Sequence, residues 1–243
     1  MFAFRDARGR VEAAFTDRHG GVSAGPYASL NLAVNDDDPH AVAENLRRVV
    51  GAFADPVEAP AVGLMRQVHG AEVAVVTPEA LAREDVPTAD ALVTREPGVV
   101  LMVRVADCVP LILADVDHRV VGAVHAGRPG LAAGVVPRAV AAMRDLGADR
   151  LVAWLGPHVC GHCYEVPEEL RAEVSALVPA ARAETSWGTP ALDIGAGVRA
   201  QLAADGVEVV DASCCTIEDT DLYSYRRQGA ASGRLAGLVW VRP

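Results

Sequence analysis

Residues 99–126 read VVLMVRVADCVPLILADVDHRVVGAVHA. Three runs within this stretch, at 99–105, 110–116 and 120–124, are dominated by Val, Leu and Ile. Continuous apolar runs of this length, rather than a strict alternation of apolar and polar residues, are typical of strands buried on both faces. We therefore predict three buried strands at the centre of the fold.

Shorter apolar runs before and after this stretch predict further strands, and other segments predict helices. Asp38 and Pro39 suit the start of a helix, because Asp can cap the first turn and Pro is tolerated in it. The order of elements is not a regular alternation of strand and helix, which argues against a Rossmann fold or a barrel. We predict an α+β fold in one domain spanning residues 1–243. The further predicted strands are 11–15, 61–65, 73–76, 151–155, 207–210 and 238–241, and the predicted helices are 39–53, 129–146, 167–178 and 192–204.

The composition excludes several functions. All 22 basic residues are Arg, so a Schiff-base lysine and a Walker lysine are both ruled out. The net charge of −10 opposes binding to nucleic acid, which needs a basic surface. No apolar run approaches the 18 residues of a membrane span, and no secretory segment is visible. Five cysteines are an odd number without the density of a disulfide scaffold, so we expect reduced thiols and a cytoplasmic protein.

Three potential metal ligands lie next to apolar runs. His69 lies in a Gln-Val-His-Gly turn, Cys108 follows the first central strand, and His125 ends the third. Two imidazoles and a thiolate suit a zinc ion that keeps a fourth position for water or substrate. The same residues also support a nucleophilic Cys108 paired with His125 and oriented by Asp107. A third interpretation is a buried thiol beside two ordinary loop histidines.

A second group of Cys and His residues lies further along the chain. The spacing of Cys160 and Cys163 is that of a zinc knuckle, and the adjacent Cys214 and Cys215 could supply another pair. Against this, a zinc ribbon has two separated Cys-x-x-Cys pairs and this chain has one. Plain buried thiols are the simpler interpretation. His158 and His162 complete the cluster in sequence.

Two arginine segments are candidates for binding an anion. Arg18 precedes a Gly-Gly pair whose backbone N–H groups could help a guanidinium hold phosphate or carboxylate. Arg226 and Arg227 form a second cationic segment in an acidic chain. The alternatives are an ordinary surface turn for the first segment and ion pairs with nearby acids for the second.

Taken in order, the motifs of the chain resemble those of one family. This is the YfiH family, long labelled a multicopper polyphenol oxidase or laccase domain and also described as purine nucleoside phosphorylase. The segments that carry the resemblance are TDRHGGVSAGPYASLNL at 16–32, QVHG at 67–70, ADALVT at 89–94, ADCVP at 106–110, HAG at 125–127, CYEV at 163–166 and YSYRR at 223–227.

The resemblance implies a four-layer α/β/β/α sandwich with mixed sheets, shared with cysteine-hydrolase-like domains. It implies a zinc ion on His69, Cys108 and His125. It also implies phosphorolysis of adenosine, inosine, guanosine and methylthioadenosine, together with adenosine deamination. An alternative role in the family is peptidoglycan editing, in which an amidase removes a wrong amino acid from a muramyl peptide. Copper fits poorly, because seven histidines without a His-x-His pair cannot hold three or more copper ions.

Within this resemblance, individual residues receive expected roles. The catalytic residues would be Cys108, His125 and Asp107, with Asp107 moving a proton. The expected partners are a purine nucleoside and phosphate, and we expect a monomer. The candidate substrate-binding residues are Arg18, Ser23, Asn31, Gln67 and Arg226.

One motif departs from the family pattern. The family usually reads His-Ala-Gly-Trp-Arg-Gly, whereas residues 125–130 read His-Ala-Gly-Arg-Pro-Gly. The aromatic side chain is lost, Arg128 is displaced by one position, and Pro129 removes a backbone donor. A second segment also departs, because residues 156–163 read Gly-Pro-His-Val-Cys-Gly-His-Cys where the family has Gly-Pro-x-Ile-Gly-Pro-Cys-Cys. The substrate range could therefore differ from that of the family. A third, non-catalytic alternative is an interaction module stabilised by zinc.

Overall fold

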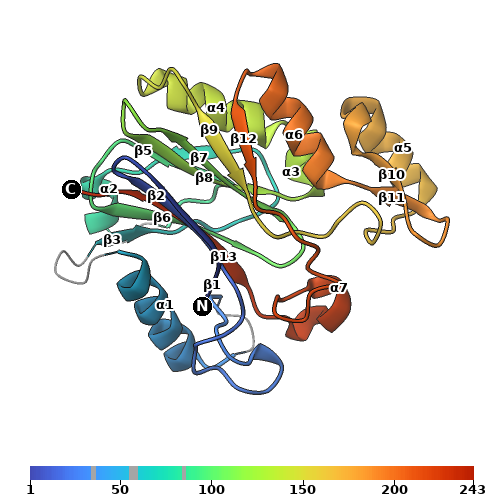
Figure 1. The fold of residues 1–243 in the computed structure, drawn as a ribbon, viewed down its shortest axis with the longest axis horizontal. Helices are drawn as coiled ribbons and strands as arrows, with labels where there is room; N and C mark the ends of the chain where they lie inside the picture. The colour runs from blue at the N-terminus through green and yellow to red at the C-terminus, as the bar shows by residue number, and fades with distance from the viewer. Residues whose placement is uncertain (34–36, 55–59, 84–85) are drawn as a thin grey trace.

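The computed structural model describes residues 1–33, 37–54, 60–83 and 86–243. Its framework is two sheets packed face to face (Figure 1). Strands from both ends of the chain lie in the same sheet, because β2 pairs with β13 there and β1 pairs with β2. The five-stranded sheet has the order β1 (Phe2–Arg8), β2 (Val11–Thr16), β13 (Leu235–Val241), β6 (Val99–Val105) and β3 (Ala61–Gly63).

The second sheet has six strands and mixed directions. Its central hairpin, β7 with β8, is antiparallel, whereas its edge pairs are parallel. Within 106–108 the chain leaves the first sheet and enters the second. The order is β12 (Glu208–Asp211), β9 (Val152–Leu155), β7 (Val109–Asp115), β8 (Val120–Ala126), β5 (Ala91–Thr94) and β4 (Val73–Val75), with a separate hairpin of β10 (Arg182–Glu184) and β11 (Pro190–Leu192).

A continuous apolar core fills the space between the two sheets. Phe15, Leu101, Ile112 and Trp154 meet there, and all four side chains are buried. Almost every residue of β6, β7 and β8 is buried, which confirms the three strands predicted from the central apolar runs. Burial of this much apolar surface is the main source of stability, at about 25 cal/mol per Å².

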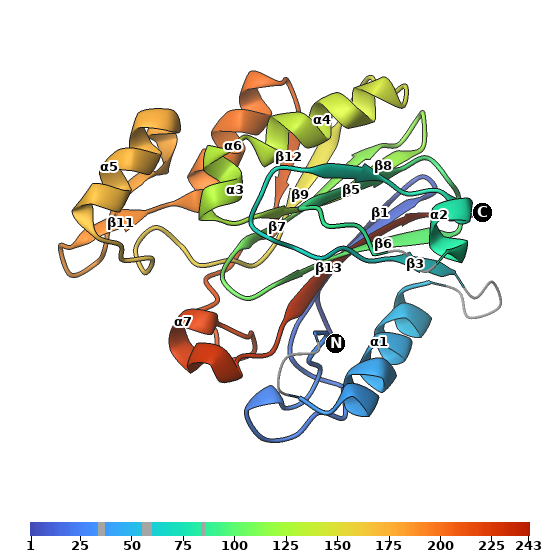
Figure 2. The same ribbon diagram turned by 180° about the vertical axis from the view of Figure 1, so that it is seen from behind.

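Helices cover the outer faces and complete four layers. α1 (Pro39–Phe53) packs Val49 and Phe53 onto the five-stranded sheet, where Phe53 lies 6.4 Å from Trp240 between ring centroids. The helices α3 (Arg128–Ala132), α4 (Val135–Asp145) and α6 (Ile194–Ala204) lie on the opposite side, over the six-stranded sheet (Figure 2). The predicted four-layer α+β sandwich is therefore confirmed. The remaining α-helices are α2 (Pro78–Ala82), α5 (Glu168–Leu177) and α7 (Tyr225–Gln228).

The structure corrects two parts of the predicted element list. The helix expected over 129–146 is two helices, because Gly134 adopts a left-handed conformation with φ of 78° between α3 and α4. Four strands were not predicted: β1, β5, β10 and β11. The first of these alternates half-buried and exposed residues at a sheet edge, so its charged residues conceal the strand pattern. No helix among the described residues is long and apolar enough to cross a bilayer.

Gly156 allows the two sheets to approach each other, and we predict that the variant Gly156→Ala is destabilised. A Cβ at this position would lie 2.4 Å from the Phe15 ring, so the buried ring would have to move. Overpacking of this kind costs about 1–3 kcal/mol. Urea unfolding should show that loss. The matched control is Gly51→Ala in α1, where a Cβ meets nothing within 4 Å and stability should rise by up to about 1 kcal/mol. Equal stability of both variants would contradict the prediction.

Candidate active site

Three separate segments bring His69, Cys108 and His125 together. His69 lies between β3 and β4, Cys108 between β6 and β7, and His125 near the end of β8. One donor atom from each residue lies within 4.8 Å of the other two. The Cys108 Sγ atom is 3.7 Å from His69 Nε2, and the two imidazole rings meet edge to face with centroids 4.7 Å apart.

A buried carboxylate, that of Asp90, orients this triad. One oxygen, Oδ1, accepts hydrogen bonds from His125 Nδ1 at 2.7 Å and from the His69 backbone N–H at 2.9 Å. The other oxygen accepts from the N–H groups of Val68 and Gly70. Because Nδ1 of His125 is occupied, Nε2 is left to face the cysteine. Burial alone would raise the pKa of Asp90, but these hydrogen bonds lower it below its ordinary value.

Close packing at Gly127 explains the glycine of the His-Ala-Gly motif. A Cβ there would lie 2.6 Å from His69 Cδ2 and 3.1 Å from Cys108 Sγ. Any larger residue would push the two potential ligands apart. His69 and Asp107 themselves have positive φ angles of 60° and 79°, which non-glycine residues seldom adopt. Unusual backbone of this kind is typical of functional sites, where surrounding contacts hold it in place.

Electrostatics favour a charged pair within the triad. Burial would raise the pKa of the Cys108 thiol, but the neighbouring imidazoles of His125 and His69 outweigh it and lower the pKa to about 6. Burial would lower the pKa of His125, whereas the cysteine and Asp90 raise it to about 9. At neutral pH the metal-free site therefore holds a thiolate beside an imidazolium. A thiolate is the form that binds metals and attacks electrophiles.

The donor set fits a zinc ion. Zinc takes His nitrogen at about 2.0–2.1 Å and Cys sulfur at about 2.3 Å in tetrahedral geometry, usually with three protein ligands in catalytic sites. The donor atoms of His69, Cys108 and His125 are close enough for small side-chain rotations to reach that geometry. The hydrogen bond from His125 to Asp90 is the second contact that a metal-binding imidazole normally makes.

The triad opens onto a cavity of about 570 Å³, a size suited to a small-molecule ligand. Arginine side chains dominate its polar lining. A second hollow of about 380 Å³ beside β3 and β4 has no titratable lining residue, so it offers no comparable chemistry. The cavity at the triad is lined by Ala33, Arg66, Gln67, His69, Arg104, Val105, Ala106, Asp107, Cys108, His125, Tyr164, Tyr225, Arg226 and Arg234.

Four arginines line the cavity, whereas Asp107 is the one carboxylate among its described lining residues. Among the described residues, no carboxylate lies within 4.0 Å of the guanidinium groups of Arg104, Arg226 or Arg234. Burial lowers the pKa of both Arg104 and Arg234, and for Arg104 the neighbouring charge of Arg234 adds to the effect. The guanidinium of Arg226 lies 4.6 Å from the centroid of the Tyr164 ring. Each of these three guanidinium groups also donates to a backbone carbonyl oxygen, but guanidinium groups without a carboxylate partner are suited to an anionic ligand.

Two further predicted residues line this cavity, but their polar atoms are engaged. Asp107 accepts hydrogen bonds from the Thr216 hydroxyl at 2.6 Å and from the Arg226 backbone N–H at 2.7 Å. Gln67 binds the backbone of Arg104 through both ends of its amide, at 2.7 and 3.0 Å. The amide of Gln67 thus holds β6 in position beside the triad.

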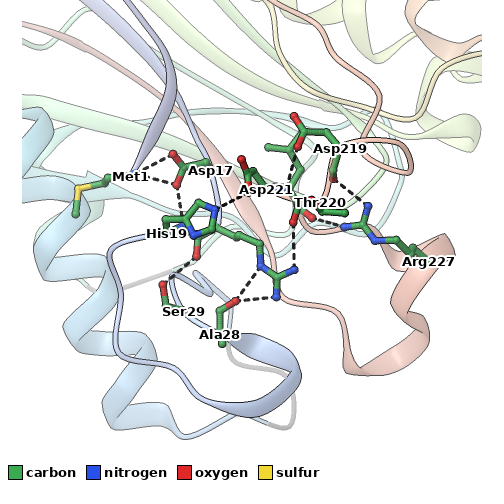
Figure 3. Close-up of polar contacts among 11 residues, drawn as sticks. Met1, Asp17, His19, Ala28, Ser29, Asp219, Thr220, Asp221 and Arg227 are labelled. Carbon is green, nitrogen blue, oxygen red and sulfur yellow. Dashed lines mark hydrogen bonds and ion pairs between the residues drawn. The ribbon is translucent and has the colours of Figure 1, made fainter.

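The other three predicted residues lie elsewhere. Arg18 donates to the carbonyl of Ala28, and Figure 3 shows Ala28 near His19 and its partner Asp221. Ser23 donates to Asp37 at 2.7 Å. Asn31 accepts a hydrogen bond from the backbone N–H of Arg234 at 2.9 Å, so it helps to position a residue that lines the cavity. None of the three is a cavity-lining residue.

Sequence reasoning missed four residues of the site. Asp90 was quoted only as part of a motif, although a lone acid between Ala89 and an apolar run was a usable signal. Arg104 interrupts a strand of apolar residues, which was a comparable signal. Tyr164 was likewise quoted only as part of the motif at 163–166. Arg234 carries no local pattern, because the contacts that place it at the cavity are long-range.

Comparison with known proteins shows a matching family model and similar proteins over nearly the whole chain. A model of the family described as multi-copper polyphenol oxidoreductase laccase matches residues 12–242. A purine nucleoside phosphorylase of Streptomyces coelicolor is 55% identical, over 99% of this chain and 100% of its own length. A purine nucleoside phosphorylase of Mycobacterium tuberculosis is 44% identical, over 96% of this chain and 92% of its own.

Solved structures agree with the sequence relatives. Protein NMB0706 of Neisseria meningitidis superposes with a TM-score of 0.86 at 34% identity, covering 98% of this chain and 96% of that one. YlmD of Geobacillus stearothermophilus gives a TM-score of 0.85 at 31% identity, covering 100% and 99%. The resemblance inferred from the ordered motifs is thereby confirmed.

The thiolate of Cys108 should be detectable by alkylation of the metal-free protein. Because its pKa is about 6, the rate of reaction with iodoacetamide should rise as the pH rises through that value and then level off. Mass spectrometry of the Cys108 peptide measures the rate. In His125→Gln the loss of the imidazolium should move the midpoint toward that of an ordinary thiol, about 8.5. An unchanged midpoint in that variant would show that His125 does not stabilise the thiolate.

Proposed function

The chain belongs to the multi-copper polyphenol oxidoreductase laccase family, and we propose that it is a zinc-dependent purine nucleoside phosphorylase. The observation that carries the proposal is the cavity, whose lining combines the His69–Cys108–His125 triad with arginines that have no carboxylate ion-pair partner among the described residues. Phosphorolysis requires an anion and a neutral nucleoside to meet in one site. The purine nucleoside phosphorylases among the relatives support the same reaction.

In this proposal the arginines bind phosphate. Arg226 and Arg234 would supply paired N–H donors, which match the geometry of phosphate oxygens. Arg104 would add charge from the floor of the cavity, where burial strengthens its interaction with an anion. A phosphate oxygen would form the bond to C1′ of the ribose while the bond from C1′ to the purine nitrogen breaks. The leaving purine takes the electron pair and a proton, giving a free base and ribose 1-phosphate.

The other cavity residues orient the nucleoside. Tyr164 and Tyr225 present aromatic rings in the cavity lining, and such rings suit stacking against a purine. Asp107 is the candidate for proton transfer, because two hydrogen bonds hold its carboxylate beside Cys108. Its free lone pairs would accept the proton of the attacking hydrogen phosphate and pass it to the nitrogen of the leaving purine.

We assign the metal to His69, Cys108 and His125. When bound there, zinc supplies a Lewis acid that activates water, the chemistry that adenosine deamination needs as a second activity of the same site. Asp90 would hold His125 in the tautomer that leaves Nε2 free for the metal. The N₂S donor set also explains why the family label does not require copper in this chain.

A second candidate function is supported by the charge state of Cys108. A thiolate beside an imidazolium is the arrangement of cysteine nucleophiles in amide hydrolysis. On this alternative the protein is an amidase that edits a muramyl peptide by removing a mis-incorporated amino acid. The two functions predict different products, so one paired assay separates them.

The paired assay tests the proposed function directly. Purified protein with phosphate should convert adenosine, inosine, guanosine and methylthioadenosine into free base and the sugar 1-phosphate, measured by chromatography. Cys108→Ala should lose more than about 100-fold in rate, because it removes a metal ligand. Cys214→Ala, which removes an exposed cysteine outside the cavity, should keep the activity. Release of an amino acid from a muramyl peptide without turnover of any nucleoside would establish the alternative.

Phosphate binding can be tested at Arg226. The variant Arg226→Ala should raise the KM for phosphate by about 10–100-fold, since a hydrogen bond to a charged group contributes about 1.5–3 kcal/mol. The KM for the nucleoside should change much less. Arg138→Ala removes an exposed arginine of α4 and serves as the control. An equal effect of both variants would assign phosphate binding to other groups.

A further inference from the structure

A second cluster of thiols lies outside the active-site cavity. One donor atom from each of Cys160, Cys163, Cys215 and Glu218 lies within 4.8 Å of the other three. All three cysteines are free and half-buried. We propose that these four residues bind a structural zinc ion, distinct from the zinc proposed at Cys108. The expected total of two ions rests on the proposed function, whereas the ion retained in Cys108→Ala does not.

The first half of this site is a tight turn. The N–H groups of Cys163 and Tyr164 both donate to the carbonyl oxygen of Cys160, at 3.1 and 3.0 Å. These hydrogen bonds fold the Cys-x-x-Cys segment so that both sulfurs face the same side. Zinc knuckles likewise hold the two cysteines of a Cys-x-x-Cys segment on one side.

The second half comes from a segment more than fifty residues later. A parallel β-bridge between His158 and Cys215 fixes that segment beside the turn. The N–H of Asp219 donates to the Cys215 carbonyl oxygen at 3.0 Å, which bends the chain and brings Glu218 back toward the sulfurs. Glu218 Oε1 accepts a hydrogen bond from the Cys163 thiol at 3.5 Å.

Arg227 fixes the loop that carries Glu218. Its guanidinium donates to the carbonyl oxygens of Thr216, Ile217 and Asp219 at 2.8–2.9 Å, and Figure 3 shows its contact with Asp219. An arginine bonded to three backbone carbonyls makes a rigid loop. The donors are therefore preorganised, which reduces the ordering entropy that metal binding would otherwise cost.

Three thiolates and a carboxylate suit zinc better than other divalent cations. Thiolates select soft or borderline ions, and a closed four-ligand set is typical of structural rather than catalytic zinc. Tetrahedral bonds of about 2.3 Å place sulfurs about 3.8 Å apart, so the cluster needs only a small contraction. A disulfide would pair two of the three sulfurs and leave the third thiol and Glu218 without a role.

The neighbours of the cluster do not compete as ligands. Cys214, adjacent to Cys215, is exposed and lies outside the group of converging donors. His158 directs Nδ1 to the carbonyl oxygen of Gly156 at 2.8 Å, and burial lowers the pKa of its imidazole. The vicinal pair that the sequence presents thus divides into one inward and one outward cysteine.

The proposal predicts two zinc ions per chain, and native mass spectrometry of the full chain supplied with zinc measures the number. We expect two ions in the unmodified protein and one in Cys108→Ala, where only the thiol cluster remains. Cys215→Ser should also keep one, and the double variant none. Cys214→Ser, the matched control one residue away, should keep two.

Cobalt substitution gives a readout that does not depend on the folding of any variant. Cobalt in the unmodified protein should give the intense thiolate-to-cobalt absorption of a site with three sulfurs, which the single sulfur at Cys108 cannot produce. That absorption should persist in Cys108→Ala. One zinc in the unmodified protein and none in Cys108→Ala would overturn the proposal, as would a disulfide among the three cysteines in protein purified under reducing conditions.

Discussion

The active site depends on one buried carboxylate. Asp90 receives three backbone N–H groups from the turn 68–70 and the Nδ1 atom of His125. It therefore fixes the left-handed backbone of His69 and the tautomer of His125 with the same two oxygens. An unpaired charge at this depth would be costly, whereas four hydrogen bonds make the buried carboxylate stabilising. Two potential metal ligands, one from a loop and one from the six-stranded sheet, are thus placed by one side chain.

The two-sheet architecture explains why the site lies where it does. The chain crosses from one sheet to the other within 106–108, which places Cys108 at the rim of the inter-sheet core. Arg104 lies near the end of β6. Arg234 directly precedes the neighbouring strand β13, and both side chains line the cavity. The charge of Arg234 adds to burial in lowering the pKa of Arg104, and in the proposed function a bound phosphate would offset that repulsion. A chain without lysine can still build this site, because guanidinium groups match phosphate geometry.

The sequence predicted the features that depend on local pattern. The buried strands β6, β7 and β8 and the capped helix α1 follow from apolar runs and from an Asp-Pro start, and the structure confirms them. The edge strand β1 was missed because edge strands carry charged residues. Recognition of ordered motifs supplied the triad, which the structure brings together. The arginine cavity could not be predicted, because β13 brings Arg234 from the far end of the chain to lie beside Arg104.

Hydrogen bonds join the active site to the second thiol cluster. Asp107, next to Cys108, binds Thr216 and Arg226, and Thr216 directly follows Cys215. On the other side, Cys163 precedes Tyr164, whose ring lies under the Arg226 guanidinium. A metal that crosslinks Cys163 to Cys215 would therefore constrain both supports of Arg226. At this edge of the cavity Arg226 lies in α7, a helix of only four residues. On the two proposals together, a fixed crosslink outside the cavity would preorganise the arginine proposed to bind phosphate within it.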